Sequence, residues 1–221
     1  MLILAVDTTT ERESVAVVAS GSVRGEVRLR AVDAHSRRVL PAAAFLLDSL
    51  GLAPGALEGY AVAAGPGAFT GLRIGISTVQ GLALAAGKPA LGLSALDVLA
   101  ARIAGEAPIL AVMVDAYRGH VFGALYDAEA RPIASAAAEP PEAFLARVPA
   151  GPVAFIGEGA RVHRGLVLER RPEATFPRRS LFLAGTLGIL AEPRLAAGEG
   201  VAAAALRPLY LREAHIGSPG P

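Results

Sequence analysis

Short apolar runs, separated by polar turns and by stretches with helical periodicity, organise the first half of the chain. Runs of four to eight apolar residues bounded by turn residues indicate strands, whereas apolar residues three and four positions apart indicate helices. The expected elements are strands at 2–6, 14–19 and 23–29, a helix at 36–50, a strand at 60–64, a helix at 71–86, a strand at 89–93 and a helix at 94–103. Ser36, Thr70 and Ser94 are the expected helix caps.

The same order of elements restarts after residue 105. The expected elements are strands at 109–114, 121–126 and 132–136, a helix at 142–148, a strand at 153–156, helices at 161–168 and 181–191, and a last strand or cap at 209–211. Each half opens with an apolar strand that ends in an aspartate, Asp7 or Asp115. The halves therefore repeat in architecture rather than in residues.

Three antiparallel strands followed by a strand–helix–strand crossover predict a mixed sheet covered by helices. We expect an α/β protein with an N-terminal lobe at 1–104, a C-terminal lobe at 105–213 and a tail at 214–221. Two such lobes are the layout of the actin, sugar kinase and Hsp70 superfamily, an analogy that concerns the fold and not the function.

Composition narrows the chemistry. The 221 residues include no cysteine and no asparagine, which excludes disulfides, thiolate metal sites, a cysteine nucleophile and N-glycosylation. The formal net charge of +1 argues against a chain built mainly around nucleic acid or an anionic membrane. The apolar start lacks a basic leader and no run is long enough to span a membrane, so we expect a cytoplasmic protein.

The turn after the first strand is a candidate nucleotide site. Asp7, Thr8 and Thr9 could offer backbone N–H groups to phosphate and a carboxylate to hydrated Mg²⁺. The same residue types also favour a turn after a strand for purely structural reasons, and no glycine lets phosphate approach this backbone. The three residues are therefore weak candidates for cofactor binding.

A glycine-rich stretch from Gly65 to Gly75 precedes and opens the helix expected at 71–86. A glycine loop that feeds a helix N-terminus can bind an anion, but no P-loop Lys-Ser/Thr follows. Gly71, Gly75 and Thr78 share one helical face and would allow a second helix to approach closely. We favour packing and partner contact over phosphate binding here.

Histidine spacing predicts no metal site, because His35, His120, His163 and His215 form no i, i+3 or i, i+4 pair.

Charge is uneven along the chain: residues 161–221 hold nine arginines against five acidic residues, whereas residues 105–160 hold three arginines against seven acidic residues. Arginines between 161 and 179 could meet RNA phosphate or an acidic protein. A solvated face is favoured, since no aromatic residues interleave for base stacking.

Four segments in order resemble the TsaB (YeaZ) family: Leu2 to Thr9, His35-Ser36, Gly65 to Gly75, and Pro208 to Arg212. The resemblance implies a two-lobed actin-like fold with a mixed, helix-covered sheet in each lobe. It also implies a role in forming N6-threonylcarbamoyladenosine at position 37 of tRNAs that read ANN codons. In that family the protein is the non-catalytic partner of the paralogue TsaD, and TsaE is the accessory ATPase.

The resemblance also bears on individual residues. TsaD carries two metal-binding histidines where this chain has Ala95 and Leu99, so we expect no metal and no enzyme activity of its own. The helices at 36–50 and 71–86 would contact TsaD, or a second copy when the chain is alone. The implied interface residues are His35, Val39, Leu40, Ala43, Phe69, Leu72 and Ile76. Replacing Leu72 with Asp would then abolish TsaD binding and leave the fold intact.

The same resemblance predicts no tightly bound cofactor, with ATP or ADP bound only in the assembled complex, and tRNA reached through that complex. Three other functions stay open. An ATP-dependent phosphotransferase of the actin-like superfamily would use Asp7 and Asp115 and would bind ATP tightly. A metallopeptidase would need the missing histidines. A stand-alone RNA-binding module would show steeply salt-dependent affinity for tRNA.

Overall fold

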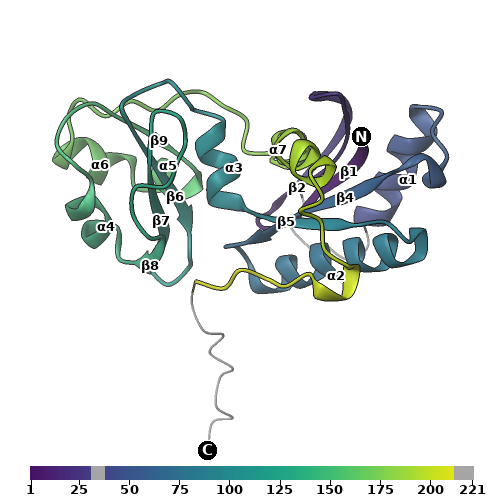
Figure 1. Ribbon diagram of the computed structural model, residues 1–221. Coiled ribbons are helices and arrows are strands. Elements are labelled where there is room, and N and C mark those ends of the chain that lie inside the picture. Colours follow the sequence, from purple (N-terminus) through teal and green to yellow (C-terminus); the bar gives the residue numbers. More distant parts are fainter. Residues whose placement is uncertain (31–37, 212–221) are drawn as a thin grey trace, which may run out of the picture.

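Two mixed sheets form the framework of the chain, each with helices against it (Figure 1). The structure is a computed structural model that describes residues 1–30 and 38–211. The elements of the first half are β1 (Leu2–Asp7), β2 (Arg12–Ala19), β3 (Ser22–Arg30), α1 (Val39–Ser49), the 3₁₀ turn η2 (Pro54–Ala56), β4 (Gly59–Gly65), α2 (Phe69–Ala86), β5 (Ala90–Ser94) and α3 (Ala95–Ala101). Those that follow are β6 (Ile109–Asp115), β7 (Val121–Asp127), β8 (Ala137–Glu139), α4 (Pro141–Arg147), β9 (Val153–Ile156), α5 (Glu158–Val162), α6 (Arg164–Arg170), α7 (Ala184–Ala196) and η3 (Ala203–Ala205).

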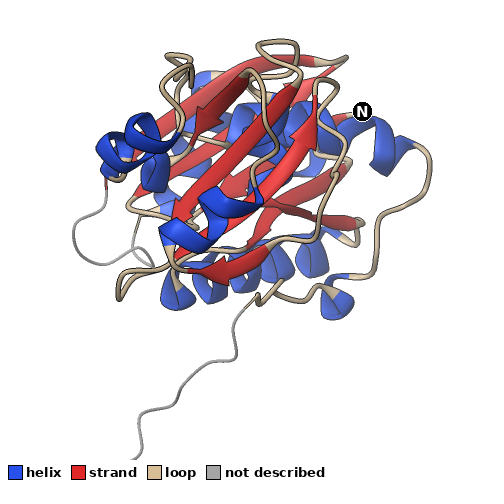
Figure 2. Cartoon of the chain, turned by 90° about the vertical axis from the view of Figure 1, so that its left-hand side faces the viewer, coloured by secondary structure: helices blue, strands red, loops and turns tan. Residues whose placement is uncertain are grey.

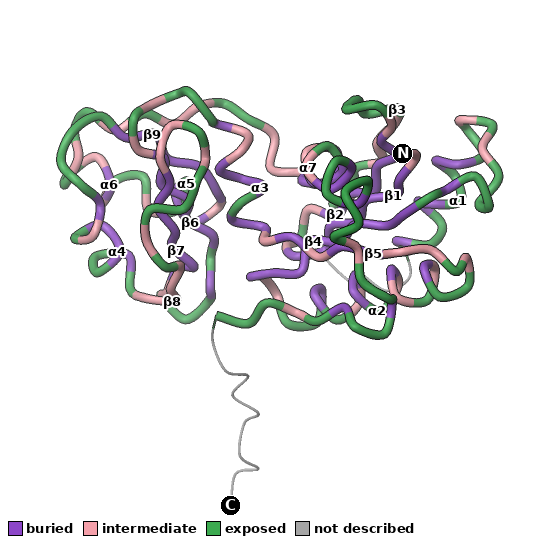
Figure 3. Tube along the Cα trace, in the orientation of Figure 1, coloured by how far each residue is buried: buried purple, intermediate pink, exposed green. Residues whose placement is uncertain are grey.

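The first sheet has the strand order β3-β2-β1-β4-β5. Its first three strands are antiparallel, and β1 pairs in parallel with β4, as does β4 with β5. Alternate residues of the buried strand β1 point to opposite faces: Leu4 and Val6 pack with α1 and α2, whereas Ile3 and Ala5 pack with α3 and α7. Figure 3 shows buried residues along these strands. Covering on both faces explains why the central strands β1 and β4 are continuously apolar, whereas the edge strand β3 carries charged residues and is partly exposed.

The second sheet has the order β8-β7-β6-β9 and repeats the mixed pattern, because β6 is antiparallel to β7 and parallel to β9. One face packs with α4 through Phe144 and Leu145. The other face shares a hydrophobic core with the first sheet, and Leu96 and Leu99 of α3 contribute to that core. Figure 2 shows helices in front of and behind the strands. The predicted two-lobed arrangement, with a mixed and helix-covered sheet in each lobe, is confirmed.

Helix α7 follows the second sheet in the chain but packs on the first sheet (Figure 1). Its Glu192 accepts hydrogen bonds from the backbone N–H groups of Ser20 (2.8 Å) and Gly21 (2.7 Å) in the β2–β3 turn. Further along, Val201 forms an antiparallel bridge with Ala90 of β5. The division at residue 104 predicted from the sequence did not anticipate this return of the chain to the first sheet.

Several expected element boundaries differ from the structure. Thr70 does not cap α2, which begins at Phe69 after Ala68 without a side-chain cap. Pro132 makes only a single bridge to Tyr126, and the third strand of the second sheet forms later, at β8, because proline has no N–H for a ladder. The helix expected at 181–191 is α7. The segment 209–211 is not a strand and is held by one backbone bond, from Leu209 N–H to the Ala64 carbonyl (2.7 Å).

Other expectations are confirmed. Ser94 caps α3, because its hydroxyl accepts hydrogen bonds from the N–H groups of Leu96 (3.2 Å) and Asp97 (3.4 Å). Strand β9 has the bounds that the sequence predicted. The expected cap Ser36 lies outside the described residues. Within the described ranges, no helix has the length and apolar character needed to cross a bilayer.

Candidate functional site

The turn between β1 and β2 is closed by its own hydrogen bonds. The fully buried Asp7 carboxylate accepts two hydrogen bonds through Oδ1, from the Thr9 N–H (3.0 Å) and the Thr9 hydroxyl (2.7 Å). Burial raises the pKa of Asp7 to about 6, although the two bonds from Thr9 act to lower it. Thr8 and Thr9 are also buried. The three residues predicted to bind a cofactor therefore lie together but face the protein interior.

The N-terminus of α2 covers this turn. The Thr8 hydroxyl donates to the Gly71 carbonyl (2.7 Å), and the Ala68 N–H donates to the Thr9 carbonyl (2.8 Å). A β-carbon at Gly71 would lie 2.0 Å from the Thr8 carbonyl oxygen, and one at Gly75 would lie 2.4 Å from the Thr8 hydroxyl. The glycines thus make room for the β1–β2 turn. The sequence analysis had instead expected them to make room for a second helix. Asp7 and Thr8 consequently have no free surface that fits a phosphate group.

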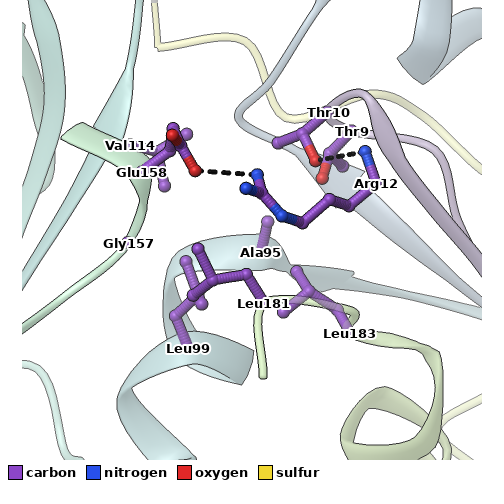
Figure 4. Close-up of a pocket in the computed structure, with 10 residues that line it drawn as sticks. All are labelled: Thr9, Thr10, Arg12, Ala95, Leu99, Val114, Gly157, Glu158, Leu181 and Leu183. Atoms are coloured by element: carbon purple, nitrogen blue, oxygen red, sulfur yellow. Dashed lines mark hydrogen bonds and ion pairs between the residues drawn. The ribbon is translucent and has the colours of Figure 1, made fainter. Parts of the chain in front are cut away.

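An ion pair crosses the cleft between the two lobes beside this turn. The Arg12 guanidinium, from the start of β2, lies 2.7 Å from the Glu158 carboxylate at the start of α5 (Figure 4). Both side chains are largely buried, with 14% and 21% of their surfaces exposed. The cavity around them measures about 20 Å³, which is room for about one water molecule. The chain's own side chains therefore fill this part of the cleft.

Ala95 and Leu99 of α3 line that same cavity (Figure 4). Both are buried and belong to the core shared by the two sheets. Neither side chain carries an atom that can ligate a metal ion. Among residues 1–30 and 38–211, no group of three or more His, Asp or Glu side chains is arranged to hold a metal ion.

A larger hollow of about 290 Å³ opens next to the Arg12–Glu158 pair. Its walls come from both lobes: Thr9, Thr10, Glu11, Arg12, Ala68, Val114, Asp115, Tyr117, Glu158 and Val162. Tyr117 has a left-handed backbone with a φ of 59°, and its N–H donates to Asp115 Oδ1 (2.9 Å). The second aspartate-bearing turn thus faces the first across this hollow. No sequence signal predicted the roles of Arg12 and Glu158, because they meet only in the folded chain.

The predicted interface residues fall into two groups. Leu40 and Phe69 are exposed on α1 and α2, with 51% and 39% of their surfaces accessible. The other described positions are buried beneath the helices and stabilise the fold, so in the chain alone their side chains are not available to a partner: Val39, Ala43, Leu72 and Ile76. Both helices are apolar on several sides, so their sequence does not reveal which side the sheet covers. His35 lies outside the described residues.

Two exposed apolar side chains on these helices were missed. Phe45 of α1 is 65% exposed and Leu84 of α2 is 75% exposed. Pro41 and Phe45 are one helical turn apart, as are Leu40 and Ala44, and all four face solvent. Once the stripe of α1 that faces the sheet is known, this spacing is the sequence signal for a second apolar stripe that faces solvent.

The exposed Phe69 takes part in a stack at the N-terminus of α2. Its ring lies 5.8 Å from the Tyr210 ring, and the Arg73 guanidinium lies 3.9 Å from its centroid. The stack fixes the segment after η3 against α2. Leu209, Tyr210 and Leu211 are all partly exposed there, so the apolar surface of α2 continues onto this segment.

Comparison with known proteins identifies the family. A solved structure from Pseudomonas aeruginosa, described as an uncharacterized protein with similarity to peptidase YEAZ, is 36% identical with a TM-score of 0.81. The match covers 96% of this chain and 99% of that one. This chain belongs to the TsaB (YeaZ) family. The family model described as TsaD, tRNA N6-adenosine threonylcarbamoyltransferase, matches residues 20–178, consistent with TsaB and TsaD being paralogues.

Two curated TsaB proteins, both described as tRNA threonylcarbamoyladenosine biosynthesis proteins, align with the chain. The Escherichia coli K12 protein is 40% identical over 129 residues and the Bacillus subtilis 168 protein is 35% identical over 126 residues. Each alignment covers 57% of this chain and 55% of the relative, so the matched part spans about half of these TsaB proteins. EutJ from Carboxydothermus hydrogenoformans, at 16% identity and a TM-score of 0.57, shares the actin-like fold alone.

Proposed function

We propose that this chain is a non-catalytic subunit that binds a TsaD-like paralogue and supports the formation of N6-threonylcarbamoyladenosine at position 37 of tRNAs that read ANN codons. The observation that carries the proposal is the content of the inter-lobe cleft. Ala95 and Leu99 line it where the resemblance to TsaD implies metal-binding histidines. The Arg12–Glu158 pair fills the adjoining space, which leaves about 20 Å³. The space beside Ala95 and Leu99 is therefore too small for a substrate, although the hollow of about 290 Å³ on the other side of the ion pair stays open.

The exposed face of α1 and α2 is the proposed contact with the paralogue. Leu40 and Phe45 of α1 and Leu84 of α2 each expose at least half of their surface. Burying apolar side chains of this size against a partner removes their surface from water, which favours association. The same face would serve a second copy of the chain when the paralogue is absent. A TsaE-like ATPase, ATP or ADP, and tRNA would then join the assembled complex.

Charge introduction at Phe45 tests this surface. Phe45→Glu should abolish co-purification with the TsaD-like paralogue, because a carboxylate would be buried without a partner. Val162→Glu is a matched control, since Val162 is 62% exposed but lies on α5 of the other lobe. Thermal unfolding should show both variants folded. If both variants lose binding equally, or if neither loses it, this face is not the contact with the paralogue.

Turnover measurements separate the proposed role from catalysis. The chain alone should form no threonylcarbamoyladenosine, and a mixture with the paralogue, the ATPase and tRNA should form it at a rate that depends on this chain. Transferase activity of the isolated chain would refute the proposal. Tight binding of ATP and Mg²⁺ to the isolated chain, measured by calorimetry, would instead support a phosphotransferase, which the buried positions of Asp7 and Thr8 disfavour.

A further inference from the structure

Four arginines line one hollow on the C-terminal lobe. The hollow measures about 230 Å³ and lies between α5, the start of α6 and the segment 176–181. Its arginines are Arg161, Arg164, Arg178 and Arg179, and no acidic residue lines it. All four are exposed. The chain as a whole has a net charge of only +1, so this concentration of positive charge is a local feature.

Two of the four guanidinium groups already have carboxylate partners outside the hollow. Arg161 pairs with Glu158, and Arg179 pairs with Glu106. In the part of the chain that the structure describes, no carboxylate pairs with Arg164 or Arg178. Within the described ranges, the hollow therefore presents two positive charges that no carboxylate neutralises.

An aromatic ring orients one of these free charges. The Arg164 guanidinium lies 4.2 Å from the centroid of the Phe176 ring, and that ring stacks on the buried Phe155 at 5.8 Å. Stacking leaves the N–H edges of the guanidinium open while holding its plane. The preference for a solvated arginine face rests on there being no interleaved aromatic residue, but Phe176 stands between Arg171 and Arg178 in the chain. The fold brings its ring against the Arg164 guanidinium.

We propose that this hollow binds the phosphate backbone of RNA. Arginine donates paired N–H groups that match two phosphate oxygens, and a guanidinium held in place loses less entropy on binding. A hollow lined by arginines and a single half-buried ring contacts a polyanion backbone rather than reading bases. The choice of RNA among polyanions rests on the proposed function in tRNA modification. The inference that the hollow binds an anion is independent of that function, because it rests on the arginine geometry alone.

The test compares two double variants of the full chain that lose the same charge. Arg164→Ser with Arg178→Ser removes the free charges of the hollow. Arg24→Ser with Arg131→Ser removes two exposed arginines elsewhere that also have no carboxylate partner among the described residues. Fluorescence anisotropy with a labelled, unmodified tRNA transcript is recorded between 50 and 200 mM NaCl, a range over which phosphate contacts weaken strongly. A polyglutamate competitor and co-purification with the paralogue are measured in parallel.

Loss of the two hollow arginines should weaken tRNA binding and make the slope of log K against log salt shallower by roughly 1.4 to 1.8, as for two lost phosphate contacts. The control pair should change the slope much less. Equal effects of both pairs, no tRNA binding by the unaltered chain at 50 mM NaCl, or displacement of tRNA by an equal charge of polyglutamate would each overturn the RNA assignment. Retained co-purification in the hollow variant separates this outcome from a failure of the proposed function.

Discussion

Gly71 marks the tightest contact between α2 and the β1–β2 turn, and its replacement by alanine should destabilise the protein. The new β-carbon would lie 2.0 Å from the Thr8 carbonyl oxygen, far inside the 3.0 Å limit below which such contacts essentially do not occur. Because the obstacle is backbone, the helix or the turn must move. That movement breaks the buried bond from the Thr8 hydroxyl to the Gly71 carbonyl (2.7 Å).

The magnitude follows from three contributions. The lost hydrogen bond costs about 1 kcal/mol. The steric conflict costs about 1–3 kcal/mol. Alanine recovers about 0.5–1 kcal/mol because glycine is a poor helix former. The net destabilisation is therefore about 1–3 kcal/mol. In the same helix, a β-carbon added at Gly81 would meet nothing within 4 Å, so Gly81→Ala should stabilise the protein by about 0.5–1 kcal/mol.

Scanning calorimetry and urea unfolding measure the difference between the two variants. A change of 1 kcal/mol shifts the Tm of a chain of this size by about 2–4 °C. Gly71→Ala should consequently melt roughly 3–16 °C below Gly81→Ala. If the two variants melt together, α2 does not hold the turn, and the turn is then free to open toward a phosphate group.

Three further predictions concern buried groups. Arg12→Ala should lower the free energy of unfolding, measured by urea titration, by about 1–2 kcal/mol. A double-mutant cycle with Glu158→Ala should show a coupling energy between the two side chains. Strict additivity of the two single effects would mean that the inter-lobe ion pair contributes nothing to stability. The pKa of Asp7 is about 6 in the folded chain against an ordinary value of 3.8, so the contribution of Asp7 to stability should fall as pH rises from about 4 to 6. The lowered pKa of Glu192 acts in the opposite direction, so the stability from urea midpoints is compared with that of Asp7→Asn at each pH. The unaltered chain should lose stability relative to Asp7→Asn over this range, and a constant difference would contradict the prediction. Leu72→Asp buries an unpaired carboxylate and should unfold the chain, as measured by circular dichroism. Phe45→Asp places the charge on an exposed position and should keep the native spectrum. A folded Leu72→Asp variant would mean that the Leu72 side chain lies at the surface.

Much of the fold could be predicted from the sequence because periodicity is a local property. Strand β9 and the Ser94 cap follow from a few neighbouring residues, and the order of strands and helices specified two mixed sheets. The face that each helix turns to the sheet could not be predicted in the same way. Leu72 and Leu84 are the same residue type on one helix, yet one is 2% and the other 75% exposed. Only the position of the sheet distinguishes them.

The sequence by itself therefore determined the two-lobed fold, the family, and the presence of Ala95 and Leu99 where metal-binding histidines would stand. The tertiary structure decided how the cleft is filled. It brings Arg12 to Glu158, returns α7 to the first sheet, and places Phe176 beside Arg164. Each of these contacts joins segments whose separation along the chain carries no periodic signal, so packing alone selects them.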